Sequence, residues 1–389
     1  MLTINECGVD SLVSNSFINA KVSEKNLTFG IDKANNIAKK CRKIHTGKEN
    51  ELCPPFKADY ASVPSESSEK YLGDIISSDG KVEKTIKMRE AKGNGAISQI
   101  MTILKNVSLG NHYFEMAIYL RNIAFVNKIL FNSGVWYPLK DNDLKPLIKI
   151  DETLMRRFLE VSDSTPKESL YLELGIIPIS DIVKCRRIIY LHYLLTLPKD
   201  QLLYKFFQAQ LRNPSKGDWC ELVEKDLRDF DIKDTYDQIA KTKENSFKKK
   251  VKKACKIYVF KKLMEIRSHH SKSKEVEYYK LETSSYLMSN IFTVAQSRLL
   301  FKLRSRMLEV KMNFKNEYND DIDLLRCKQC NSGEFDDQRH ILSCKVLDNN
   351  KNSTIKYVDL FSKDLSTVKK AITVYEKSWN EMCTRSSQV

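Results

Sequence analysis

Four residues near the C-terminus have the types and spacing of a metal site. Cys327 and Cys330 are three positions apart, and His340 and Cys344 are four positions apart. Two thiolates at the first spacing can share one tight turn, and a His and a Cys at the second spacing lie on one helix face. Because protein side chains would fill all four positions of a tetrahedral ion, we predict a structural zinc and no metal catalysis. The alternative is that three incidental or buried cysteines and a satisfied histidine share this spacing.

The segment between the two pairs of ligands must bring them together. Asn331 and Gly333 favour a turn, and acidic residues precede the helix that is expected to present His340. Such a segment can close a small module of its own around the metal. We place this zinc module at residues 321–348.

Composition and charge narrow the class of protein. The chain has 389 residues, 42% of them hydrophobic and 30% charged, with only 12 Gly and 9 Pro, a balance that favours helices. Its formal net charge of +15 points to a polyanionic partner, either nucleic acid or an anionic membrane surface. No apolar run is long enough to cross a membrane. Ten cysteines without a signal sequence are typical of a reducing compartment, so we expect a nuclear or cytoplasmic protein that is not secreted.

The positive charge is concentrated between Lys241 and Lys280. A lysine run leads there into apolar residues at helical spacing, which predicts one long amphipathic helix with a basic face. We predict that this basic region, residues 236–320, binds nucleic acid through cation–phosphate contacts. The predicted contacts on the first helix are Lys248, Lys249, Lys250, Lys252, Lys253 and Lys256. The alternatives are a solvated helix face and a nuclear-localisation patch; membrane attachment is disfavoured by the lack of a lipidation signal or a Trp-rich apolar face.

A second predicted helix, residues 293–314, leads into the zinc module. It places cations four apart beside a row of apolar residues, which suits a helix that packs on the body and offers cations to a nucleic-acid backbone. The predicted helix at 144–159 carries further cations. On these two helices the predicted nucleic-acid contacts are Arg298, Lys302, Arg304, Arg306, Arg156 and Arg157.

One stretch resembles a known family. The segment Glu69–Lys81, EKYLGDIISSDGK, is similar to the last palm strands of reverse transcriptases from non-LTR (LINE-type) retrotransposons. Thr165–Ile179, the stretch KLRSRM and the position of the Cys-Cys-His-Cys residues continue the resemblance over residues 9–348, which implies the end of the palm, the thumb and the zinc module. It implies an RNA template or target DNA as partner, together with the missing palm and fingers. It also transfers a primer-grip role to Tyr71, Leu72 and Gly73.

The carboxylates that polymerisation requires in that family are not found. They hold two divalent cations and come from an early palm strand and a (Phe/Tyr)-x-Asp-Asp hairpin, but no such hairpin precedes Tyr71. The Asp320–Asp323 segment lacks flanking apolar strands, so we expect solvated surface there. We therefore assign no catalytic residues and expect no polymerase activity from this chain alone. The alternative is a helical interaction protein, or an inactive retroelement remnant whose basic region serves nuclear import or solubility.

The predicted fold is mainly α with a small β-containing part. A helix at 9–24 and strands at 27–30, 41–46 and 71–80 form a palm-end remnant, residues 1–80. A helical thumb-like region follows at 81–235, and residues 349–389 form a polar tail with at most one weak helix, around Val368–Trp379. Trp136 and His192 are expected in the core rather than in a binding site. Other helices are predicted at 82–104 (interrupted at Gly93 and Gly95), 113–131, 179–197, 202–211 and 219–227.

Overall fold

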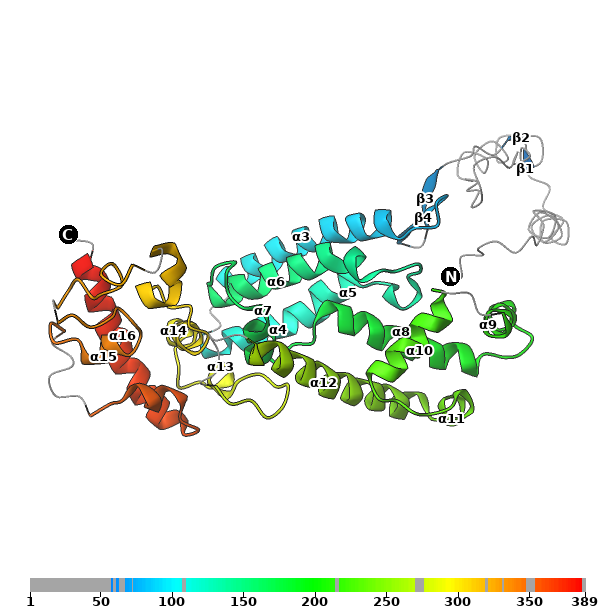
Figure 1. The fold of residues 1–389 in the computed structure, drawn as a ribbon. Coiled ribbons are helices and arrows are strands. Elements are labelled where there is room, and N and C mark those ends of the chain that lie inside the picture. Colours follow the sequence, from blue (N-terminus) through cyan, green and yellow to red (C-terminus); the bar gives the residue numbers. More distant parts are fainter. Residues whose placement is uncertain are drawn as a thin grey trace. The chain divides into compact units, whose positions relative to one another are not determined.

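The computed structural model confirms the predicted mainly α fold with a small β part (Figure 1). The predicted helix at 9–24 and strands at 27–30 and 41–46 lie outside the residues that the structure describes. Among the described residues, no helix combines the length and apolarity needed to cross a bilayer. The described residues are 57–58, 61–62, 67–71, 73–106, 110–213, 217–269, 276–318, 321–330, 332–347 and 354–386.

Two compact units are built from interleaved stretches of the chain. The first unit comprises residues 1–92, 129–147 and 183–251, and the second comprises residues 93–128, 148–182 and 252–389. The predicted boundaries near 80, 235 and 320 do not follow these units. The reason is that contacts within the second unit join segments that those boundaries would separate. Glu173, for example, lies 2.7 Å from Arg304 in a buried ion pair.

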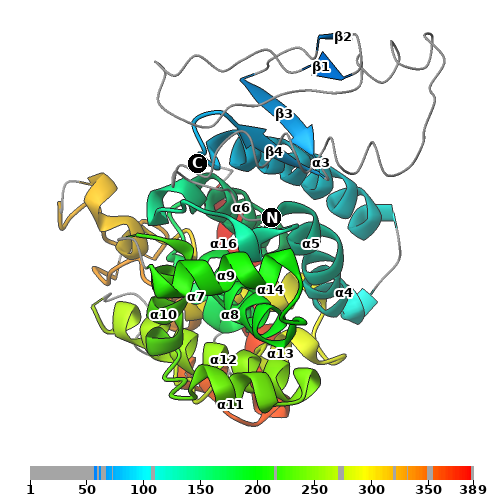
Figure 2. The same cartoon turned by 90° about the vertical axis from the view of Figure 1, so that its right-hand side faces the viewer.

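Short antiparallel hairpins precede the first long helix among the described residues. The pairs are β1 (Lys57–Ala58) with β2 (Ala61–Ser62) and β3 (Ser68–Tyr71) with β4 (Asp74–Ser77). The prediction of one strand from Tyr71 to Gly80 is wrong, because Gly73 has φ +93° and reverses the chain between β3 and β4. The expected turn after the apolar strand is formed at Gly80, and the chain then enters α3 (Glu83–Asn106; Figure 2).

Helix α3 runs without a break through Gly93 and Gly95, so the predicted interruption is wrong. Each helical Gly costs about 1 kcal/mol relative to Ala, but Ile97, Ile100 and Leu104 are all buried along the same helix and offset that cost. The later helices are α4 (Tyr113–Leu120), α5 (Val126–Ile129), α6 (Lys145–Leu159), α7 (Lys167–Leu174), α8 (Ile179–Thr196), α9 (Leu202–Arg212), α10 (Trp219–Asp229), α11 (Tyr236–Lys241), α12 (Glu244–Ser268), α13 (Ser285–Met288), α14 (Val294–Arg304), α15 (His340–Ser343) and α16 (Leu365–Ser386).

An aromatic cluster occupies the core of the first unit. The indole nitrogen of Trp219 donates to the carbonyl of Gly134 at 3.0 Å. Trp136 is 3% exposed, which confirms its core assignment. His192 is also buried, and its Nε2 lies 2.8 Å from the carbonyl oxygen of Thr242. The imidazole stacks on the ring of Phe247, so the prediction of a core histidine is confirmed as well.

A buried ion pair anchors the second unit. Between α4 and α5 the helix passes through a π-helical turn, Arg121–Phe125, and the side chain of Arg121 is almost completely buried. Its Nε and Nη2 each lie 2.7 Å from an oxygen of Asp151, and Nη2 also donates to the carbonyl of Ile177. This two-pronged geometry is the strong form of an Arg–carboxylate pair, so the π-turn is fixed by a specific contact.

Candidate metal centre and nucleic-acid interface

The four predicted metal ligands converge in the structure. Their ligand atoms all lie within 4.8 Å of one another, and the Sγ of Cys330 is 3.4 Å from the Nε2 of His340. Cys327, His340 and Cys344 are buried, whereas Cys330 is half-buried. Three sulfurs and one imidazole nitrogen thus face one point, a donor set that could hold a metal ion.

A small hairpin positions the first two ligands. Arg326 and Phe335 form an antiparallel bridge, and the backbone N–H of Cys327 donates to the carbonyl of Glu334 at 2.8 Å. Gly333, predicted as a turn residue, has φ +77°. The chain therefore reverses just after Cys330 and returns toward the second pair of ligands.

Glu334 orients the imidazole of His340. Its Oε2 lies 2.6 Å from Nδ1, which places the proton on Nδ1 and leaves Nε2 facing the sulfurs. A carboxylate behind a ligating imidazole is typical of metal-bound histidine. Asp337 accepts the backbone N–H groups of Arg339 and His340 at 2.9 and 2.7 Å, so an acidic residue does precede this helix as expected. Glu334 was missed as a site residue, although its place among the acidic residues of the linker was a usable signal.

The three thiols of the cluster differ in acidity. Burial raises the pKa of Cys327 and raises that of Cys344 to about 12. Burial also acts to raise the pKa of Cys330, but hydrogen bonds outweigh it and lower this pKa to about 7. The strongest of these hydrogen bonds involves Ser332, whose Oγ is 3.0 Å from the sulfur. A metal ion would favour the thiolate form at all three positions.

The metal-ligand loop is tied to α16 through Gln338, a buried residue two positions before His340. Its side-chain amide donates to the carbonyl of Leu303 at 3.0 Å, and its backbone carbonyl accepts the hydroxyl of Tyr375 at 2.9 Å. The weak helix predicted around Val368–Trp379 is present, and it is longer than expected. After a 3₁₀ turn at Tyr357–Phe361, α16 forms a helix of 22 residues in the same part of the second unit as α14 and α15 (Figure 1).

Helix α12 has the predicted amphipathic form. Its buried residues repeat every four positions: Phe247, Val251, Cys255, Val259 and Leu263. Of the lysines predicted to bind nucleic acid, Lys248 pairs with Glu244 and Lys250 pairs with Asp234. Within the described part of the chain, the other exposed lysines of α12 have no ion-pair partner. They are Lys249, Lys252, Lys253, Lys256 and Lys261.

The predicted basic stripe on residues 293–314 is not formed. Helix α14 ends at Arg304, and Arg306 follows it with φ +52°, outside the helix. Arg298 lies 2.7 Å from Glu160 and donates to a backbone carbonyl at 3.1 Å. Arg304 is paired with Glu173 at 2.7 Å. These cations face the protein's own carboxylates, because the partners are supplied by distant segments of the second unit.

Other predicted cations are also engaged. Lys302 lies 3.5 Å from Glu309, and Arg156 lies 3.4 Å from Glu152, so both belong to intramolecular ion pairs. Arg157 differs, because its side chain is exposed. Of the cations predicted on the helices at 144–159 and 293–314, Arg157 is the one that the structure leaves at the surface without an acidic partner in the described residues.

The predicted primer-grip residues lie at the β3–β4 turn. Tyr71 ends β3, and Leu72 is outside the described residues. The carbonyl of Gly73 accepts a hydrogen bond from Arg89 at 2.8 Å. Their primer-grip role stays a prediction. In the acidic segment after Tyr318, Asp321 and Asp323 are exposed, as expected of solvated surface.

No family model, no curated protein and no solved structure matches the chain. The resemblance to non-LTR reverse transcriptases therefore rests on the sequence motifs alone.

Proposed function

We propose that this chain binds nucleic acid through the exposed lysines of α12 and that its Cys-Cys-His-Cys cluster holds a structural zinc ion. The observation that carries the proposal is the contrast along α12. Lysines on the same helix either pair with the protein's own acids or stand in solvent without an acidic partner in the described residues. Four lysines without such a partner belong to the second unit, and we call them the lysine face: Lys252, Lys253, Lys256 and Lys261.

The lysine face sits on a rigid support. Cys255, Val259 and Leu263 are almost completely buried on the same helix, which fixes the orientation of the exposed side. Lys262, which directly follows the last member of the face, lies 3.3 Å from the buried Asp181 and helps to anchor the helix. Cations held on an ordered helix can contact successive phosphates, and each contact releases counterions.

Binding measured across a salt series tests this proposal. If each lysine of the face neutralises one phosphate of a duplex, replacing all four by Gln should reduce the slope of log affinity against log salt by about 3–4. The control removes the same charge from exposed lysines elsewhere. It is the quadruple Gln variant of Lys105, Lys199, Lys205 and Lys225.

The two quadruple variants separate the proposal from its rivals. A loss confined to the lysine-face variant supports a nucleic-acid interface. Equal losses, or weak binding that is indifferent to salt in the unmodified chain, would favour a helical interaction protein or an inactive remnant whose charge serves solubility or nuclear import.

The zinc proposal is supported by the donor set and by the carboxylate behind His340. Elemental analysis of the purified chain should find about one zinc ion per chain, and Cys330→Ser should lose it. Cys383→Ser is the matched control, because this cysteine is exposed and lies outside the cluster. Nucleic-acid binding that weakens after chelation would show that the metal module supports the interface, and full retention of zinc by Cys330→Ser would refute the assignment.

We also propose that the chain derives from the C-terminal part of a non-LTR retrotransposon reverse transcriptase. The motif order from Tyr71 to Cys344 supports this origin. The genomic sequence just upstream tests it. An in-frame Asp-Asp hairpin there would make polymerisation a property of the longer parent protein, whereas unrelated coding sequence would argue against the origin.

A further inference from the structure

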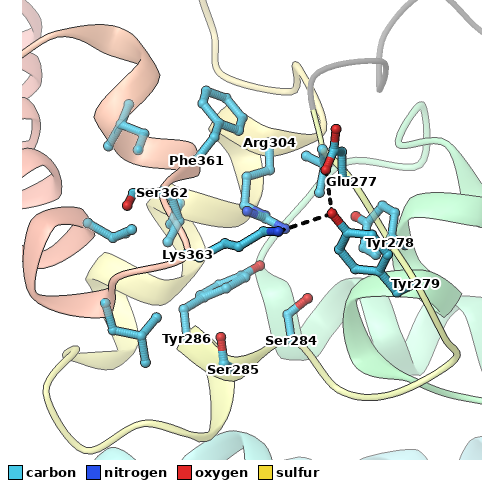
Figure 3. A pocket seen from close by; sticks show the side chains of 15 residues that line it. Glu277, Tyr278, Tyr279, Ser284, Ser285, Tyr286, Arg304, Phe361, Ser362 and Lys363 are labelled. Carbon is cyan, nitrogen blue, oxygen red and sulfur yellow. Dashed lines mark hydrogen bonds between the residues drawn. The ribbon is translucent and has the colours of Figure 1, made fainter.

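A cavity of about 420 Å³ lies within the second unit (Figure 3). Its volume is in the range of small-molecule sites. Its lining combines aromatic rings, hydroxyls and cations with one carboxylate, Glu277, and several aliphatic side chains. The rings include Tyr279 and Phe361, and Lys363 supplies an exposed ammonium group. The hydroxyls come from Ser284, Ser285 and Ser362.

A buried network fixes the floor of the cavity. Glu173, which is 1% exposed and is not part of the lining, accepts hydrogen bonds from two residues that are: from the Nε of Arg304 at 2.7 Å and the hydroxyl of Tyr278 at 2.6 Å. Ser284 donates to the other carboxylate oxygen. The charge of Arg304 is thus neutralised by Glu173, which leaves Lys363 as the cation available to an incoming anionic group.

Tyr279 forms an exposed aromatic wall. Its side chain is 67% exposed, yet it is held at both ends, since its hydroxyl donates to Glu277 at 2.5 Å and accepts from Lys363 at 3.2 Å (Figure 3). The ammonium of Lys363 also lies 5.1 Å from the centre of the ring. A large aromatic ring that is both exposed and fixed can serve as a platform for stacking.

Two residues that line the cavity contact the end of the helix that carries the lysine face. Arg267, in the last turn of α12, donates to the carbonyl of Val276, and its guanidinium lies 4.9 Å from the ring of Tyr278. Lys261 is six residues earlier on α12, about 9 Å along the helix axis. A strand on the lysine face therefore needs to extend only a short distance to reach the cavity.

We infer that this cavity binds one unpaired nucleobase, stacked on Tyr279 with its phosphate at Lys363 and its edge against the serine hydroxyls. Aromatic rings beside cations are the recurrent means of binding unpaired bases. The inference rests on the proposed nucleic-acid function and adds a preference for single strands to it. The base can come from a single strand or from a free nucleotide, and the two sources share this chemistry.

Fluorescence anisotropy with the full chain tests the inference, using labelled oligo(dT) as the single strand and a duplex of the same length. Tyr279→Ala should weaken single-strand binding by about 5- to 150-fold, the loss typical of one stacked base, and leave duplex binding unchanged. Tyr279→Phe keeps the ring and should bind like the unmodified chain. Tyr119→Ala is the matched control, because Tyr119 is an exposed tyrosine of α4 outside the cavity.

A calorimetric titration with thymidine monophosphate distinguishes the sources. Binding that Tyr279→Ala abolishes would show that the cavity accepts a free nucleotide, whereas an effect on oligo(dT) alone would show that the base comes from a strand. Tyr279→Ala without effect on any probe, or with equal loss for single strand and duplex, would overturn the inference. The two proposals fail separately. If Tyr279→Ala has no effect, the quadruple lysine-face variant still tests nucleic-acid binding by α12. If the chain does not bind the duplex, the titration with thymidine monophosphate still tests the cavity.

Discussion

Replacing Glu173 by Gln should destabilise the second unit strongly. The carboxylate is 1% exposed and accepts hydrogen bonds from Arg304, Tyr278 and Ser284. Burial and the Glu173 carboxylate both raise the pKa of Tyr278, so this phenol stays a neutral donor. Gln has the same shape but no charge, and Arg304 would remain buried without its counter-ion.

Removing one partner of a buried ion pair costs about 3–5 kcal/mol. For a unit of this size, each kcal/mol shifts the melting temperature by about 2–4 °C, so Glu173→Gln should lower it by roughly 6–20 °C. Circular dichroism during heating, with zinc in the buffer, measures the transition in which the second unit unfolds.

Glu282→Gln is the matched control for this prediction. Glu282 also forms an ion pair, at 2.8 Å from Lys280, but both side chains are largely exposed and such pairs contribute at most about 1 kcal/mol. A second variant, Glu173→Leu combined with Arg304→Met, removes both charges and should lose less stability than Glu173→Gln alone. Equal melting temperatures for Glu173→Gln and Glu282→Gln would refute the reasoning.

Three further changes have defined outcomes. Gly175→Ala should abolish stable folding of the second unit, because Gly175 has φ +63° and an added Cβ would lie 2.1 Å from the backbone nitrogen of Thr283. Urea unfolding measures this effect, and a decrease of under about 1 kcal/mol in the free energy of unfolding would contradict it. Burial raises the pKa of Asp226 to about 6, so between about pH 4 and 6 the folded chain binds more protons than the unfolded chain. The stability that this group contributes therefore falls as the pH rises. Asp226→Asn should remove that part of the pH dependence of urea unfolding. Cys344→Ser should expose Tyr375 to solvent by releasing the loop next to α16, and unchanged near-ultraviolet circular dichroism would argue against that coupling.

The metal cluster could be predicted from the sequence because its geometry is mostly local. Two cysteines three apart and a His and a Cys four apart are brought together by a turn and one helical turn. The buried stripe of α12 was predictable for the same reason, since a repeat of four positions determines which side of a helix is apolar.

The partners of the arginines in α14 could not be predicted from the sequence. Arg298 and Arg304 look like free cations in the sequence because their acidic partners, Glu160 and Glu173, come from segments more than a hundred residues earlier. Only the tertiary fold determines which charges meet. A basic residue on an amphipathic helix can therefore be either an interface residue or one half of a buried ion pair.

Helix α16 was predicted only as a weak helix around Val368–Trp379, because its lysines and threonines mask a regular apolar repeat. Val368, Ile372 and Tyr375 are at helical spacing and are almost completely buried. Their partners are the metal-ligand loop and α14, so the helix gains its stability from tertiary contacts rather than from its own composition.

The hydrogen bond from Tyr375 to Gln338 can form only after α16 has been synthesised, later than the metal ligands. Tyr375 lies about 30 residues beyond Cys344, the last metal ligand, so at about 5–20 residues per second the ligands are made roughly 2–6 s before α16 can dock. In that interval the thiols have their metal-binding spacing but lack the helix that covers the loop. A metal ion captured then would hold the loop ready for α16, whereas oxidation of the thiols would leave the last helix without a surface on which to close.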